Sequence, residues 1–140
     1  SDHYAQHMLD TTILYESVIE VLEHFREKKK LIVTNKRKYF TVAMTDALGI
    51  SHYFDDIIGA DSTPYRKPDP HLLIPLVEKF GSENSNTVVI GDGVSDVMLA
   101  KSAGVLSCAL LNGLTPGNVL RSMNPDFACE ELSEIKELFR

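Results

Sequence analysis

Short apolar segments alternate with longer amphipathic segments along this chain. The apolar segments have the length of buried strands and cover residues 31–33, 57–58, 87–90 and 105–111. The amphipathic segments repeat their apolar side chains at helical spacing, which predicts helices at residues 3–14, 17–29, 36–48, 70–81, 96–103 and 130–139. Gly49, Gly81 and Gly104 follow three of these helices and are expected to end them. Pro75 should kink its helix or shift its start.

Strands that alternate with helices predict an α/β fold, namely a Rossmann-like parallel sheet with helices on both faces. The length of 140 residues suits one domain. In such a sheet, ligands bind beyond the carboxyl ends of the strands. The polar residues that directly follow the strands are therefore the first candidates for a functional site.

The composition limits the kinds of molecule that this chain is expected to bind. The formal net charge of -6 disfavours nonspecific nucleic-acid binding, which needs a basic surface, but a small anionic substrate can still bind at a locally positive site. We see no apolar stretch long enough for a membrane span and no signal peptide, so a cytoplasmic location is expected. Cys108 lies in an apolar segment, and we expect a small core residue rather than a disulfide with Cys129.

Two carboxylates mark a candidate metal site. Asp92 follows the predicted strand at residues 87–90, and Asp96 comes four residues later at the start of a helix. Neighbouring carboxylates suit Mg²⁺, and Gly91 and Gly93 allow the backbone to turn tightly beside a ligand. The alternative is that Asp92 is an ordinary loop residue and Asp96 only a stabilising acid at a helix start.

Two further segments are candidates for binding an anion. Thr34 and Asn35 follow the strand at residues 31–33, where a hydroxyl and the first amides of a helix can hold a phosphate; alternatively, one of them only caps the helix. Lys67 lies between a turn and Pro70, which opens a helix, and a fixed ammonium there can neutralise a phosphoryl group. The alternative for Lys67 is an ordinary lysine in an exposed turn.

These three motifs, in this order after successive strands, resemble the haloacid dehalogenase superfamily and, within it, the phosphoglycolate phosphatase-like branch. Residues 53–61 and 67–70 look like the same branch, and the resemblance runs from about Ile13 to the C-terminus. It implies a magnesium-dependent hydrolase of small phosphorylated metabolites that works through an aspartyl-phosphate.

The resemblance also implies a role for each candidate residue. Thr34 would contact the transferring phosphoryl group, Asn35 would shape the same pocket, and Lys67 would stabilise the phosphoryl charge and the nucleophile. Asp92 would bind Mg²⁺ directly and act in catalysis with Thr34 and Lys67. Asp96 would bind the metal directly or through water.

The nucleophile of the family is missing from this sequence. Members of the family have an N-terminal strand that ends in Asp-x-Asp, where the first aspartate attacks phosphorus and the second acts as general acid and base. No Asp-x-Asp occurs here, and Asp10, the nearest candidate, lies in a predicted helix. We favour the interpretation that residues 1–14 are the end of a cap region, that residues 15–140 form the core domain, and that the chain is processed or a fragment, since it does not begin with Met.

The fold should be affected as well, because the resemblance places that first strand between the strands at residues 31–33 and 87–90. Without it, two buried strand edges lack partners, and each unpaired buried backbone group costs about 1–3 kcal/mol. Either the missing N-terminal segment or a second copy supplies the strand, or the two edges pair with each other.

Two functions from different classes follow. The leading hypothesis is the phosphate monoester hydrolase, with the chain alone inactive, and the alternative is a non-catalytic module that keeps the phosphate and metal site for binding. A response-regulator receiver domain fits poorly, because its acidic pair precedes the Thr and Lys sites, whereas here the pair comes last.

Overall fold

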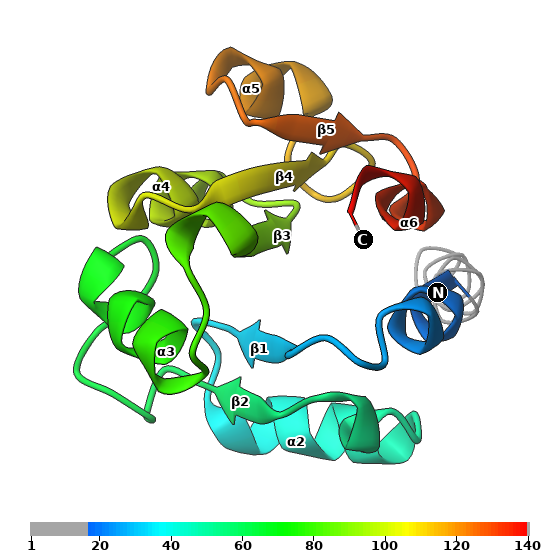
Figure 1. The fold of residues 1–140 in the computed structure, drawn as a ribbon, viewed down its shortest axis with the longest axis vertical. Coiled ribbons are helices and arrows are strands. Elements are labelled where there is room, and N and C mark those ends of the chain that lie inside the picture. The colour runs from blue at the N-terminus through cyan, green and yellow to red at the C-terminus, as the bar shows by residue number, and fades with distance from the viewer. Residues whose placement is uncertain (1–16, 140) are drawn as a thin grey trace, which may run out of the picture.

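The computed structural model describes residues 17–139, which form two parallel sheets (Figure 1). The first sheet pairs β1 (Leu31–Val33) with β2 (Asp56–Ile58), and the second contains β3 (Val88–Gly91), β4 (Leu106–Leu110) and β5 (Phe127–Cys129) in the order β3-β4-β5. Every pairing within the two sheets is parallel. The predicted α/β class is therefore confirmed.

Helices connect these strands. They are α2 (Lys38–Ala47), α3 (Ile74–Lys79), α4 (Val94–Ala103), α5 (Gly117–Ser122) and α6 (Ile135–Leu138), with helical residues 17–24 ahead of β1. Short 3-10 turns are η1 (Ser51–Tyr53), η2 (Pro70–Leu72), η3 (Asn84–Asn86) and η4 (Leu132–Glu134). Within residues 17–139, no helix has the length and apolar character needed to cross a membrane.

Most helix ends follow the predicted signals. Gly49, Gly81 and Gly104 have positive φ angles of 70°, 66° and 74°, the left-handed geometry expected of residues that end a helix. Pro75 lies in the first turn of α3, so the helix predicted at residues 70–81 is split into η2 and a later, shorter α3.

The prediction for the C-terminal part was wrong. The closing helix expected at residues 130–139 is replaced by η4 and the four-residue α6, and α5 and β5 were not predicted at all. Glu131 has an extended backbone, and its N–H donates to Glu134 Oε2 at 2.8 Å, so helical geometry begins only after it. β5 has only three residues, too few to show a strand period.

The two sheets do not join. In residues 17–139, β1 and β3 do not pair with each other and no strand lies between them. Figure 1 shows β1 and β2 on one side of the molecule and the three-stranded sheet on the other. Ile90 of β3 is 37% exposed, although its strand is predicted to be buried. The alternative in which the two edges pair with each other is therefore wrong for the described part of the chain.

Helix packing links the halves instead. Val21 of the N-terminal helix packs into a cluster with Cys108, Cys129 and Ile135 of the second half, and Glu20 pairs with Lys136 of α6. The same helix lies beside α6 in Figure 1. On the other side of the molecule, Leu73 packs in a cluster with three residues of α4 and with Val105. The halves therefore keep a defined arrangement without a continuous sheet.

The two cysteines are free thiols of the core. Cys108 and Cys129 are each 2% exposed, and their Sγ atoms lie 3.8 Å apart on neighbouring strands. Burial, together with the neighbouring Cys129, raises the pKa of Cys108 to about 12. The prediction that Cys108 is a small core residue is confirmed.

The helix α4 offers a matched test of this packing. Leu99 is 1% exposed, whereas its neighbour Met98 is 42% exposed. Leu99→Ala should lower the free energy of unfolding by about 2–5 kcal/mol, because it leaves a cavity in the core, while Met98→Ala should change it by less than about 0.5 kcal/mol. Urea unfolding curves measure both. Equal effects of the two variants would contradict the packing described.

Candidate active site

Lys67 and Asp96 form an ion pair between the two halves of the fold. Lys67 Nζ donates to Asp96 Oδ1 at 2.7 Å, and each side chain is only 13% exposed. Lys67 belongs to the loop after β2, and Asp96 to the first turn of α4, after β3. The contact therefore lies at strand carboxyl ends, and Lys67 is not an ordinary lysine in an exposed turn.

Asn35 connects the end of β1 to the same lysine. Its side-chain Nδ2 donates to the Lys67 carbonyl oxygen at 3.2 Å, and its Oδ1 accepts from the Lys67 N–H at 3.0 Å. Both polar groups of the Asn35 amide are thus engaged by one residue that is 32 positions away in sequence. The structure brings Asn35, Lys67 and Asp96 together.

Thr34 extends β1 by one residue, since its N–H donates to the Ile58 carbonyl at 2.9 Å. Its hydroxyl accepts from the Lys36 N–H at 3.1 Å, which closes a tight local turn. The helix predicted to follow Asn35 directly begins only at Lys38, so neither Thr34 nor Asn35 caps it. Thr34 is adjacent to Asn35 in sequence, so its hydroxyl lies at the same strand end.

Asp61 caps α2 in place of the predicted residues. Its Oδ1 accepts from the Lys38 N–H, the first amide of the helix, at 2.9 Å. This hydrogen bond, followed by smaller contributions that include Arg37 and Lys38, lowers the pKa of Asp61. The amide at the helix start is therefore already occupied by a carboxylate. Sequence reasoning missed Asp61 because the cap comes from a different loop, 23 residues along the chain.

Asp92 is held by the loop that follows β4. Its Oδ2 lies 3.4 Å from the Leu114 N–H, and a side chain at Gly113 would overlap the Asp92 carboxylate. Gly113 and Leu114 were not predicted to be part of the site. In the sequence, Gly113 was the one hint of this contact. The reason that a glycine is needed there is the close approach of the Asp92 carboxylate.

Asp96 is engaged through both of its oxygens. Oδ1 accepts from the Lys67 ammonium, and Oδ2 accepts from the Gly93 N–H at 3.1 Å. A Cβ at Gly91 would overlap the same carboxylate, so the glycine is required there. Asp96 therefore acts as an acid of the helix start, which was the alternative interpretation, and at the same time as the partner of Lys67.

The donor set of Asp92 and Asp96 fits a Mg²⁺ that completes its coordination with water and substrate oxygens. Carboxylate oxygens are the ligands that Mg²⁺ prefers, and one or two of them are typical of phosphate-handling sites. In the described part of the chain, no group of three or more His, Cys, Asp or Glu side chains gathers to hold a metal. Because both Asp96 oxygens already have partners, Asp92 is the better candidate for direct contact.

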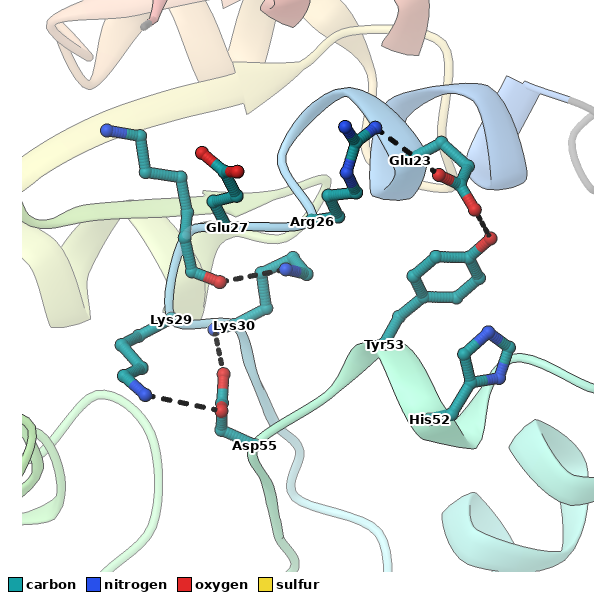
Figure 2. A pocket seen from close by; sticks show the side chains of 9 residues that line it. Glu23, Arg26, Glu27, Lys29, Lys30, His52, Tyr53 and Asp55 are labelled. Atoms are coloured by element: carbon teal, nitrogen blue, oxygen red, sulfur yellow. Dashed lines mark hydrogen bonds and ion pairs between the residues drawn. The ribbon is translucent and has the colours of Figure 1, made fainter.

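A surface pocket lies at the amino ends of β1 and β2, opposite the carboxyl ends that form the candidate site (Figure 2). It has a volume of about 310 Å³, and its lining consists of Glu23, Arg26, Glu27, Lys28, Lys29, Lys30, His52, Tyr53 and Asp55. Glu23 contacts Arg26 and Tyr53, and Asp55 accepts from the Lys30 N–H at 2.8 Å. Lys30 and Asp55 directly precede β1 and β2, so this pocket is separate from the carboxyl-end site.

Comparison with known proteins assigns the family. The profile of the haloacid dehalogenase-like hydrolases matches residues 2–104. The chain belongs to this family. The resemblance noted from the motifs at the strand ends is therefore confirmed.

Individual relatives agree with the family. The chain is 36% identical to a phosphoglycolate phosphatase of Vibrio parahaemolyticus over 139 residues, which cover 98% of this chain and 61% of the relative. A crystal structure described as a predicted phosphoglycolate phosphatase from Haemophilus somnus 129PT superposes with a TM-score of 0.80 at 29% identity, covering 86% of this chain and 55% of that one.

A more distant structure shares the fold. The putative hydrolase YfnB of Bacillus subtilis, described as bound to magnesium, has a TM-score of 0.78 at 19% identity, with 89% of this chain and 55% of that chain covered. The present chain thus spans about 61% of the length of its Vibrio relative and about half of these solved structures. Residues 1–14, including Asp10, lie outside the described residues.

The Asp61 cap should make stability depend on pH. Because the folded protein lowers the pKa of Asp61, the carboxylate stabilises the fold above its ordinary pKa of about 3.9, and this contribution is lost as the pH falls through the lowered value. Asp61→Asn should therefore be less stable than wild type near pH 7, and the difference should shrink below about pH 4. Urea midpoints measured from pH 7 to pH 3 test this. A difference that stays constant over that range would contradict the cap.

Proposed function

We propose that this chain is part of a magnesium-dependent hydrolase of small phosphate monoesters, similar to phosphoglycolate phosphatases. The observation that carries this proposal is the position of Lys67, a largely buried cation fixed by Asn35 and Asp96 at the carboxyl ends of the strands. A phosphoryl group bound there would meet a fixed positive charge. Such charges stabilise the negative charge of a transferring phosphoryl group.

The remaining candidates have complementary roles in this proposal. Thr34, at the end of β1, would donate a hydrogen bond from its hydroxyl to a phosphoryl oxygen. Asp92 would hold Mg²⁺ directly, while Asp96 would contact the metal through water and keep its pair with Lys67. Bound Mg²⁺ would supply further neutralisation of phosphoryl charge.

The nucleophile is proposed to come from outside residues 17–139. An aspartate at the end of a strand between β1 and β3 would attack phosphorus, the alcohol would leave with a proton, and water would then hydrolyse the aspartyl-phosphate. Within residues 17–139, β1 and β3 each have one edge without a paired strand, which supports this proposal because an open strand edge can pair with a further strand. Either another segment of a longer protein or a second copy could provide that strand.

The metal assignment can be tested without activity. Asp92→Asn should weaken Mn²⁺ or Mg²⁺ binding at least about tenfold, because a direct ligand is lost, and Asp96→Asn should weaken it less. Asp46→Asn, on the exposed part of α2, is the control and should bind as wild type does. Water-proton relaxation of bound Mn²⁺ measures all four proteins. Unchanged affinity in Asp92→Asn would remove Asp92 as a ligand.

We expect phosphatase activity to differ between this chain and a longer protein to which an upstream strand and a cap have been added. The longer protein should release phosphate from a small phosphate ester, and Lys67→Ala should lower its rate by about 10²–10³-fold. The chain alone should show only the background rate, since Lys67 and the metal ligands cannot form the covalent intermediate.

Two controls separate the alternatives in that assay. Turnover by the short chain that Asp10→Asn abolishes would assign the nucleophile to Asp10. Turnover that Asp10→Asn leaves unchanged would exclude an aspartyl-phosphate at that residue and contradict the proposed mechanism. A longer protein that binds Mg²⁺ and phosphate but never turns over would favour the non-catalytic binding module.

A further inference from the structure

Asn35 holds the backbone of Lys67 at two points. The Lys67 N–H donates to Asn35 Oδ1 at 3.0 Å, and the Lys67 carbonyl accepts from Asn35 Nδ2 at 3.2 Å. An amide side chain that bonds both the N–H and the carbonyl of one residue fixes the direction of that residue's peptide groups. We refer to these two hydrogen bonds as the Asn35 clamp.

The clamp acts together with the ion pair. The Lys67 side chain has several rotatable bonds, so its ammonium has a fixed position only when both ends of the side chain are held. Asn35 holds the backbone end, and Asp96 Oδ1 holds the ammonium at 2.7 Å. Asn35 and Lys67 follow β1 and β2 of one sheet, and Asp96 belongs to α4, so the ion pair connects the clamped lysine to the other half of the fold.

Direct phosphate binding is the competing role for Asn35. An amide nitrogen carries two N–H groups, so one of them is still able to reach a ligand. However, the Asn35 side chain faces the Lys67 backbone with both its oxygen and its nitrogen. Any further contact with a phosphoryl group would be limited to that single N–H.

We propose that Asn35 is a positioning residue, which acts on the phosphoryl group through Lys67 rather than by binding it. This inference rests on the proposed function for the identity of the ligand, but the clamp itself does not depend on it. Small displacements of a fixed charge can cost as much as about 100-fold in rate, so loss of the clamp should weaken the effect of Lys67.

A double-mutant cycle with inorganic phosphate in the presence of Mg²⁺ tests the route of action. Asn35→Ala should weaken phosphate binding by about 2- to 10-fold when Lys67 is present, and by less than about twofold in the Lys67→Ala background. Asn118→Ala, an exposed amide on α5, is the control and should have no effect. Isothermal titration calorimetry measures the five proteins. Equal losses in both backgrounds would overturn the proposal, because Asn35 would then bind phosphate independently of Lys67.

Amide hydrogen exchange at Lys67 tests the clamp without any ligand. Asn35→Ala should speed exchange of the Lys67 N–H by about 2- to 10-fold, and Asn35→Asp, which keeps the acceptor oxygen, should preserve its protection. Equal exchange in wild type and Asn35→Ala would overturn the clamp. If wild type protects the Lys67 N–H but binds no phosphate, the clamp stands and the proposed function fails.

Discussion

The Lys67–Asp96 ion pair is the contact on which the geometry of the candidate site depends. It joins the loop after β2 to the first turn of α4, and so links the two sheets where their strands end. Removing one partner of a buried pair typically costs about 3–5 kcal/mol, because the other charge is left in a poorly solvated place. With 13% exposure on each side, this pair is only partly buried, so removing one partner should cost less than that. Its main effect is to fix geometry, since burial of both charges offsets much of their attraction.

The second constraint is the pair of unpaired edges on β1 and β3. Each strand is hydrogen-bonded on one side only within residues 17–139, and the apolar clusters of the second half involve α4, α6 and the N-terminal helix. The chain crosses between the halves through the segments at residues 25–30 and 59–87, and side-chain contacts reinforce these crossings. The halves are thus placed next to each other by helices and loops rather than by a continuous sheet of residues 17–139.

The sequence was sufficient for those parts of the fold that depend on local pattern. The strands β1 to β4 and the helix ends at three glycines were correctly predicted, because a buried strand and a left-handed helix end can each be recognised from a few neighbouring residues. α5 and β5 were missed because they are short, and the closing helix was wrong because Glu131 is extended. Local patterns of this length do not distinguish a turn of 3-10 helix from a full helix.

In the candidate site, too, local pattern predicted the positions of the residues but not the contacts that fix them. Alternation of strands and helices was enough to place Thr34, Asn35, Lys67, Asp92 and Asp96 at strand carboxyl ends. The contacts that fix Lys67 and the start of α2 could not be predicted, because their partners lie far away in sequence: Asn35 bonds Lys67 across 32 residues, and Asp61 caps α2 across 23. Such contacts depend on how the loops meet in space, which only the folded chain determines.

The loop between β2 and η2 is held at three points, and this explains why the cation is already in place. Asp61 bonds the first amide of α2, Lys67 bonds Asn35 and Asp96, and Asp69 accepts from the His71 N–H at 2.9 Å at the start of η2. Electrostatic stabilisation of a transition state works best when the charges are fixed before the substrate arrives. All three anchors belong to residues 17–139, so the positioning of Lys67 does not require a strand between β1 and β3. The two contributions to the proposed reaction are therefore physically separate: the described residues fix the charge, and an added strand would supply the nucleophile.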